Sequence, residues 1–191
     1  MIQAMRLTTP LTGAMIRKLK IGDRVLISGK IYTARDTAHK RLDELIRTGR
    51  ALPLDLKGQT IYYAGPAPTK PGRIIGPIGP TTAGRCDRYT PALLNLGLKG
   101  MLGKGSRSAA VVAAIKRREA VYFCVTGGAA ALIAKNIISV KVVAFPELGP
   151  EAITELNVAN LPAIVAIDCR GNDLFESGPK KYRLFNKKEE L

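Results

Sequence analysis

The second half of the chain alternates between short apolar runs and helical patterns, and this alternation limits the possible folds more than any other feature. We expect extended segments at residues 98–102, 120–125, 140–145 and 163–167, and helices between the first three of them at residues 106–118 and 128–135. Ahead of them a helix is expected over residues 83–96, where Pro91 should kink or split it. Strands that alternate with helices favour parallel pairing, so we expect a layered α/β fold with a partly parallel sheet.

The first half predicts more strands and one amphipathic helix. Runs of β-branched and aromatic residues between turn signals predict strands at residues 24–28, 30–33, 60–64 and 73–78. Because these strands look hairpin-like, with Gly29 and a Pro/Gly-rich loop between them, we expect them to form a second β element. Apolar residues recur at helical spacing from Ala38 to Ile46, behind a capping-box-like pair of Thr33 and Asp36.

The length of 191 residues, 46% of them hydrophobic, allows one sizeable core. We expect a single domain over residues 1–176 and a charged C-terminal tail over residues 177–191. No apolar run reaches the roughly 18 residues of a membrane span, and residues 1–6 lack the apolar core of a signal peptide. We therefore expect a cytoplasmic protein that does not contact a membrane.

The formal net charge of +15 attracts nucleic acid, acidic proteins and small anions alike. Short basic clusters at residues 116–118, 180–181 and 187–188 come without zinc-finger spacing or an aromatic-rich nucleic-acid motif. Solvated helix faces and a charged tail explain these clusters better than a nucleic-acid surface does. A basic nucleic-acid-binding module without enzymatic activity remains the alternative from another class of function.

The cysteines and the histidine argue against a metal site in this chain. Cys86, Cys124 and Cys169 equal in number the protein ligands of a [4Fe-4S] cluster with one open iron, but they are far apart in sequence and include no C-x-x-C pair. We expect buried or incidental thiols. His39, the only histidine, is a candidate base, although a lone histidine without a placed carboxylate or nucleophile is more often structural.

Three tight turns carry cationic side chains. Backbone N–H groups, the hydroxyls of Thr81 and Thr82 and the guanidinium of Arg85 gather on one Gly-rich turn, a combination that suits a carboxylate. Arg35 stands at the head of the first amphipathic helix, and Lys104 lies between two glycines. Cations on three turns indicate a small polyanionic substrate. The glycines around the lysine match neither a Walker loop nor G-x-G-x-x-G.

Six ordered motifs add a family resemblance. They are Thr-Ala-Arg-Asp-Thr-Ala-His at residues 33–39, Gly-Pro-Ile-Gly-Pro-Thr-Thr-Ala-Gly-Arg at 76–85, Met-Leu-Gly-Lys-Gly at 101–105, Gly-Gly-Ala-Ala at 127–130, Phe-Pro-Glu-Leu-Gly at 145–149 and Gly-Asn-Asp at 171–173. Over residues 7–176 the chain resembles the β-type catalytic domain of class I fumarases, which tartrate dehydratases share. The resemblance implies a swivelling β/β/α domain that closes over a [4Fe-4S] cluster held by a separate α-type domain. We therefore expect the β subunit of a hetero-oligomer with a cluster-bearing α subunit, inactive without it.

The resemblance also implies roles for the turn residues. Arg35, Arg85 and Lys104 are placed on the substrate carboxylates, with Thr81 nearby. Thr82 is placed close to the carbon that loses or gains a proton. A Thr hydroxyl is a poor base unless neighbouring cations and a partner carboxylate lower its pKa, so substrate positioning stays the alternative for Thr82.

The choice of substrate follows from smaller differences between related enzymes. The Thr-Thr-Ala-Gly-Arg form of residues 81–85 resembles fumarases, so reversible hydration of fumarate to malate is expected. Residues 7–11 and 53–56 also occur in similar form in tartrate enzymes, which keeps the β subunit of L-tartrate dehydratase as an alternative.

Overall fold

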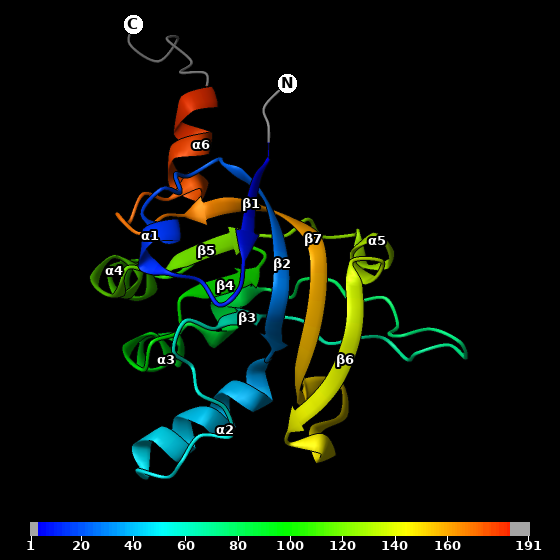
Figure 1. The fold of residues 1–191 in the computed structure, drawn as a ribbon. Helices are drawn as coiled ribbons and strands as arrows, with labels where there is room; N and C mark the ends of the chain where they lie inside the picture. The colour runs from blue at the N-terminus through cyan, green and yellow to red at the C-terminus, as the bar shows by residue number, and fades with distance from the viewer. Residues whose placement is uncertain (1–3, 184–191) are drawn as a thin grey trace, which may run out of the picture.

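The chain forms a mixed α/β structure built on one seven-stranded sheet (Figure 1). This computed structural model describes residues 4–183. The strands are β1 (Met5–Thr8), β2 (Arg24–Thr33), β3 (Thr60–Tyr62), β4 (Gly100–Gly103), β5 (Val121–Cys124), β6 (Ile137–Ala144) and β7 (Ile153–Ile167). The α-helices are α1 (Gly13–Ile16), α2 (Asp36–Arg47), α3 (Thr90–Asn95), α4 (Ala109–Arg118), α5 (Ala130–Ala134) and α6 (Leu174–Tyr182), and the 3-10 helices are η1 (Ala83–Cys86) and η2 (Pro146–Glu151). The predicted α/β class is confirmed.

The sheet runs in the order β1-β2-β3-β4-β5-β7-β6. Strands β1 to β5 pair in parallel, whereas β7 runs antiparallel to β2, β5 and β6. Because β7 pairs with β2 along residues 154–164 and with β5 along residues 164–167, the strands β2, β3, β4, β5 and β7 close into a ring. The prediction of a partly parallel sheet is confirmed. The expected hairpins of the first half are wrong, because β1, β2 and β3 pair in parallel and the antiparallel pairs involve β7.

Two hydrophobic clusters lie on opposite faces of the ring strands, since neighbouring residues of a strand point to opposite sides. We call the cluster that contains Leu102 of β4 the inner cluster, and the cluster that contains its neighbour Met101 the outer cluster. The outer cluster joins these strands to α2, α3 and α4 through Leu42, Leu93 and Ile115. Figure 1 shows these helices on one side of β3, β4 and β5, with β2, β7 and β6 on the other. The arrangement is therefore layered.

Strand β2 and the start of α2 differ from expectation. Residues 24–33 form one strand, and Gly29 is a bulge in it with a φ of +103°. A Cβ there would stand 2.7 Å from Thr9 Oγ1, so glycine is required by both backbone angle and space. The predicted capping role of Thr33 is wrong: Thr33 ends β2 and donates to the carbonyl of Ala152, while Arg35 is the N-cap residue of α2.

Three other segments differ from expectation. The strand predicted at residues 73–78 is wrong: these residues belong to a long loop, in which the N–H of Ala67 donates to the carbonyl of Pro77 over 2.9 Å. The strand expected at 163–167 is only the end of β7. The helix expected at 83–96 is split into η1 and α3, with Pro91 in the first turn of α3, as its ring and missing N–H predict.

The C-terminal tail begins as a helix. Residues 177–182 continue α6, and residues 184–191 lie outside the described part of the chain, so the division at residue 176 stays a prediction. Within residues 4–183, no helix is both long and apolar enough to cross a membrane.

Candidate functional site

Two turns, one before η1 and one after β4, are joined by backbone hydrogen bonds at the candidate site. Thr82 and Lys104 form a parallel bridge. The N–H of Ala83 donates to the carbonyl of Lys104 over 3.0 Å, and the N–H of Lys104 donates to the carbonyl of Thr81 over 3.2 Å. This pairing sets Thr82 next to Lys104, although the two residues lie on separate segments of the chain.

Thr81 and Thr82 use their hydroxyls differently. The hydroxyl of Thr81 donates to the carbonyl of Tyr63 over 2.8 Å, and its N–H donates to the same carbonyl over 2.7 Å. Thr82 is exposed at the N-cap position of η1, and its side chain makes no capping hydrogen bond. Thr81 therefore fastens the turn to the residue that follows β3, while the hydroxyl of Thr82 is available to a bound molecule.

Arg85 lies on the same side of η1 as Thr82, because residues three apart are stacked in a 3-10 helix. Its Nη2 is 3.2 Å from Oδ2 of Asp36, in the first turn of α2. The side chains of this ion pair are 49% and 39% exposed. The contact places η1 beside the start of α2, where Arg35 is the preceding residue.

Arg35 lies against the backbone at Gly65. A Cβ on Gly65 would stand 3.0 Å from Cδ of Arg35 and 2.5 Å from the carbonyl oxygen of Pro150, so glycine leaves the room that Arg35 occupies. Nη2 of Arg35 is 3.7 Å from Oε1 of Glu151, and its Nε is buried without a hydrogen-bond partner among the described residues. The guanidinium is thus held by one long ion pair and keeps donor capacity for another acceptor.

Two carboxylates lie among the arginines. Glu151 accepts a 2.8 Å hydrogen bond from the N–H of Thr37 at the start of α2. Partial burial works to raise the pKa of Glu151, but the hydrogen bonds from Thr37 and the charges of Arg35 and Arg85 hold that pKa below its ordinary value. Glu151 is therefore ionised at neutral pH. Together with Asp36 it offsets part of the positive charge of the two arginines.

Lys104 adds an exposed positive charge. Its side chain runs alongside Gly127, where a Cβ would lie 3.9 Å from Nζ. Among residues 4–183 no carboxylate comes within 4.0 Å of its ammonium group. The three predicted turns therefore adjoin one another: backbone pairing joins Thr82 to Lys104, and the ion pair between Arg85 and Asp36 joins this pair of turns to Arg35.

His39 is not placed for catalysis. Its side chain is fully buried, Nδ1 donates to the carbonyl of Arg35 over 2.8 Å, and its ring centroid lies 5.2 Å from that of Tyr63. Burial lowers the pKa of His39 to about 4. The residue supports the first turn of α2 from inside the outer cluster, which agrees with the structural role expected of a lone histidine.

The cysteines do not form a ligand set. Cys86 is buried in the outer cluster, Cys169 is buried in the inner cluster, and Cys124 is partly buried. Burial raises the pKa of Cys86 to about 12 and also raises that of Cys124, which disfavours the thiolate needed for metal binding. In the described part of the chain no group of three or more His, Cys, Asp or Glu side chains could hold a metal ion. These side chains therefore do not fit an iron–sulfur cluster.

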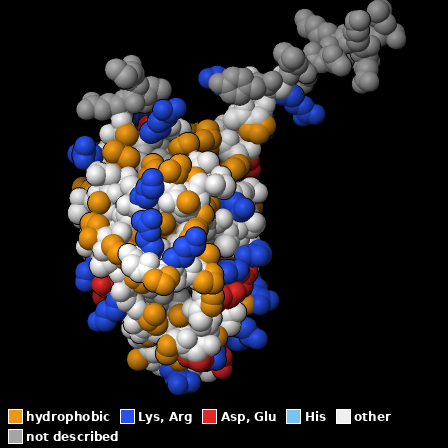
Figure 2. Space-filling view, turned by 90° about the vertical axis from the view of Figure 1, so that its right-hand side faces the viewer, with side chains coloured by type: hydrophobic (Ala, Val, Ile, Leu, Met, Phe, Trp, Pro, Cys, Tyr) orange, Lys and Arg blue, Asp and Glu red, His pale blue; other side chains and the backbone are white. Residues whose placement is uncertain are grey.

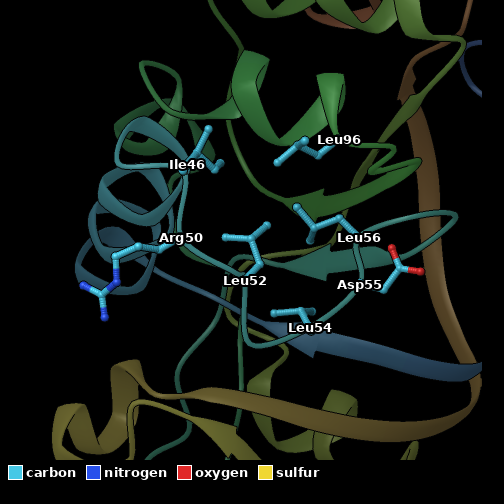
Figure 3. Close-up of a pocket in the computed structure, with 8 residues that line it drawn as sticks. Ile46, Arg50, Leu52, Leu54, Asp55, Leu56 and Leu96 are labelled. Atoms are coloured by element: carbon cyan, nitrogen blue, oxygen red, sulfur yellow. The ribbon is translucent and has the colours of Figure 1, made fainter.

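A separate hollow of about 510 Å³ lies between the ends of α2 and α3 (Figure 3). Its wall is mainly aliphatic, with Ile46, Leu52, Leu54, Leu56 and Leu96 around it. None of its lining residues belongs to the three turns. An aliphatic wall does not suit a small polyanion, so the hollow is not part of the candidate site.

Sequence reasoning missed the residues that support the site from other elements. Glu151 lies just beyond the Phe-Pro-Glu-Leu-Gly motif, and nothing local marks it as a partner of Arg35. Asp87 and Arg107 form a 2.6 Å ion pair behind the turns, and the side chain of Arg107 is fully buried. The one available signal was Asp87 itself, an acid two residues after Arg85 on a turn otherwise rich in cations and hydroxyls.

Known proteins resemble this chain over most of its length. A family model described as "Fumarase C-terminus" matches residues 2–178. "Fumarate hydratase 2" of Leishmania major is 42% identical over 157 residues, 81% of this chain and 28% of that protein. "Fumarate hydratase class I, anaerobic" of Escherichia coli K12 is 42% identical over 165 residues, 85% of this chain and 30% of that protein. The chain thus spans less than a third of the length of these fumarate hydratases.

A third relative matches nearly the whole length of the chain. "Putative L(+)-tartrate dehydratase subunit beta" of Methanocaldococcus jannaschii is 39% identical over 187 residues, which are 95% of both proteins. The two fumarate hydratases and the M. jannaschii protein therefore each match more than four-fifths of this chain.

Proposed function

Because the chain belongs to the fumarase C-terminus family, we propose that it is the β subunit of a fumarate hydratase, which reversibly hydrates fumarate to malate. The proposal is carried by one observation beside the family: the pairing that sets Thr82 next to Lys104, with Arg85 and Arg35 on the adjoining turns. Three cationic residues and an exposed threonine on adjoining turns suit a small dianion in which one carbon gains or loses a proton.

The arginines are proposed to bind the substrate carboxylates. A guanidinium donates two parallel hydrogen bonds to one carboxylate, whereas an ammonium group acts as a point charge. Arg35 and Arg85 therefore fix the orientation of the dicarboxylate, and Lys104 adds charge. Asp36 and Glu151 hold the guanidinium groups ready for the substrate.

Thr82 is proposed to donate or accept the proton at the substrate carbon that gains or loses one in the reaction. Thr82 is the exposed threonine of the turn, and backbone pairing places it beside Lys104, whose positive charge we propose favours the deprotonated hydroxyl when substrate is bound. Thr81 is proposed to position the turn, because its hydroxyl is already bound to the carbonyl of Tyr63. Substrate positioning remains the second possibility for Thr82.

The [4Fe-4S] cluster is proposed to belong to a separate α-type subunit. Two observations support this: Cys169 lies in the inner cluster, whereas Cys86 and Cys124 pack in the outer one, and the M. jannaschii relative of equal extent is named a subunit. When bound, such a cluster supplies a Lewis acid for the hydroxyl or water. The residues of this chain bind and orient the dicarboxylate and stabilise its charge.

The α-type partner is proposed to present an acidic or neutral surface. The chain carries a net charge of +15, and the face in Figure 2 shows more Lys and Arg than Asp and Glu, with hydrophobic side chains between them. Two strongly basic surfaces would repel each other. The layered arrangement of helices and two groups of strands is compatible with a swivelling β/β/α domain over residues 1–176, which we propose closes on the partner. We propose that the complex acts in the cytoplasm.

The alternative substrate is tartrate, which the M. jannaschii relative favours by its name and its equal extent. The alternative of a nucleic-acid-binding module has no support in these comparisons. The test is to purify the chain together with a cluster-bearing α-type subunit without oxygen, and to compare kcat/KM for fumarate hydration, followed by loss of fumarate absorbance, with that for tartrate dehydration, followed by oxaloacetate formation. Faster turnover of tartrate would favour the alternative. Turnover of neither substrate would overturn both proposals.

A further inference from the structure

A buried arginine lies directly behind the two paired turns. The side chain of Arg107 is fully buried, and its Nε donates to Oδ1 of Asp87 over 2.6 Å. Its Nη2 donates to the hydroxyl of Thr90 over 2.9 Å and to that of Tyr63 over 3.3 Å. A buried charge is costly unless it is paired and hydrogen-bonded, and here a carboxylate and two hydroxyls meet that need.

Two tyrosine rings and a sulfur atom also lie close to the guanidinium. Its Cζ lies 5.0 Å from the ring centroids of both Tyr63 and Tyr122, at cation–π distance. Its Nη1 approaches the sulfur of Met101 at 3.7 Å. Arg107 is therefore fully buried and in contact with Asp87, Thr90, two tyrosines and Met101, so a change at Arg107 is expected to be felt by all of these groups.

The partners of Arg107 are the same groups that hold the two turns of the candidate site. Asp87 follows η1 as its C-cap residue, and its Oδ2 accepts a 2.5 Å hydrogen bond from the N–H of Ser108. The carbonyl of Tyr63 holds Thr81, and the hydroxyl of Tyr122 donates to the carbonyl of Gly105 over 3.0 Å. Arg107 is therefore connected to the turn of Thr82 through Asp87 and Tyr63, and to the turn of Lys104 through Tyr122.

We propose that Arg107, with Asp87, is a positioning residue that sets the distance and angle between the turn of Thr82 and the turn of Lys104. The expected effect on the reaction rests on the proposed function, whereas the link between the two turns does not. Arg107 touches no substrate, because it is sealed beneath the turns. A shift of about 1 Å in a positioned group can lower a rate by up to a hundredfold, so loosening this contact should lower kcat without unfolding the chain.

The test uses the variants Arg107→Lys and Asp87→Asn, with Asp168→Asn as the control. Arg107→Lys keeps the positive charge and loses the planar guanidinium. Asp87→Asn keeps the shape but removes the negative charge of the ion pair, and it provides a second variant if the first one fails to fold. Asp168 is also a buried carboxylate that accepts backbone hydrogen bonds, but it lies in the turn between β7 and α6, away from the paired turns.

The first measurement is amide hydrogen exchange of the full chain by mass spectrometry. Faster exchange confined to peptides covering residues 81–87 and 103–108 is expected for both test variants, with peptides of β6 and β7 unchanged. Asp168→Asn should leave the two turns unchanged. Equal acceleration throughout the chain, or no change at the turns, would overturn the positioning role.

The second measurement is steady-state fumarate hydration by the complex with the cluster-bearing subunit. Both test variants should lower kcat about tenfold or more with KM changed less than about twofold, and the control should match the wild type. Unchanged kcat in variants whose turns exchange faster would overturn the proposal. A wild-type complex without hydratase activity would overturn the proposed function instead, and the exchange result would still decide whether Arg107 ties the two turns together.

Discussion

Replacing Arg85 by lysine tests the proposed carboxylate site in one step. The variant keeps the charge but loses the planar group that can donate two parallel hydrogen bonds to one carboxylate. Hydrogen bonds to charged groups contribute about 1.5–3 kcal/mol each. Losing one of the pair should therefore cost about 2 kcal/mol of transition-state stabilisation, roughly a thirtyfold fall in kcat/KM.

The same substitution should leave the fold intact. The side chain of Arg85 is 49% exposed, and its ion pair with Asp36 spans 3.2 Å at the surface. Exposed ion pairs contribute about 0–1 kcal/mol to stability, so Tm should fall by less than about 4 °C. A loss of activity with an unchanged Tm assigns the effect to the site.

The assay is steady-state fumarate hydration by the complex, with Arg73→Lys as the matched control. Arg73 is also exposed, but it lies in the long loop that precedes η1 and outside the paired turns. The control should retain the wild-type kcat/KM. Equal effects of the two substitutions, or a fully active Arg85→Lys complex, would refute the assignment of Arg85 to a substrate carboxylate.

Three further predictions concern Thr82, His39 and the cysteines. Thr82→Val removes the hydroxyl and keeps the shape, so kcat should fall about a hundredfold at nearly constant KM; a change in KM alone would demote Thr82 to substrate positioning. Burial holds the pKa of His39 at about 4 in the folded chain, against about 6.5 when unfolded, so its contribution to stability is complete above pH 6.5 and is lost as the pH falls toward 4. Because His39 is the only histidine, the decline of the urea midpoint between pH 6.5 and 5 should largely vanish in His39→Gln, and an undiminished decline would contradict this. The isolated chain treated with iron and sulfide should acquire no stable charge-transfer absorption, because Cys86, Cys124 and Cys169 lie apart; a stable cluster would place its ligands on this chain.

Elements with a local cause were predictable from the sequence. Helix α2 follows from apolar residues at helical spacing, and α4, β4 and β5 follow from clean alternation of helical and apolar segments. The split at Pro91 follows from the proline ring and its missing N–H. Each of these signals lies within the segment that it describes.

Elements that depend on distant partners were not predictable in the same way. Gly29 marks a break in the sequence pattern, but β7 pairs with β2 on both sides of it, so the strand continues through a bulge. Asn160 has a positive φ within β7, and Pro162 lies two residues later. Asn and Pro are typical of turns, so the sequence did not predict a strand here, although β7 pairs with three other strands. Residues 73–78 have strand-like composition but find no strand to pair with.

The residues of the candidate site also fall into those that a local sequence signal indicates and those that depend on distant contacts. Arg85 and Lys104 stand directly beside glycines that mark tight turns, and Thr82 lies two residues before Gly84, so the sequence itself indicates these positions. Glu151 and Arg107 act across long distances in the sequence, the first on Arg35 and the second on the two paired turns, and only the folded chain reveals these contacts.

The most direct test of the account is a titration of this chain into a purified cluster-bearing α-type subunit while fumarate hydration is measured. We expect no turnover by either component alone, and a rate that rises with added chain and saturates at a fixed ratio of the two. We expect the Thr82→Val chain to saturate at the same ratio with a far lower rate. Full activity of the cluster-bearing subunit alone, or no activity at any ratio, would contradict the claim that this chain supplies the substrate-binding half of the enzyme.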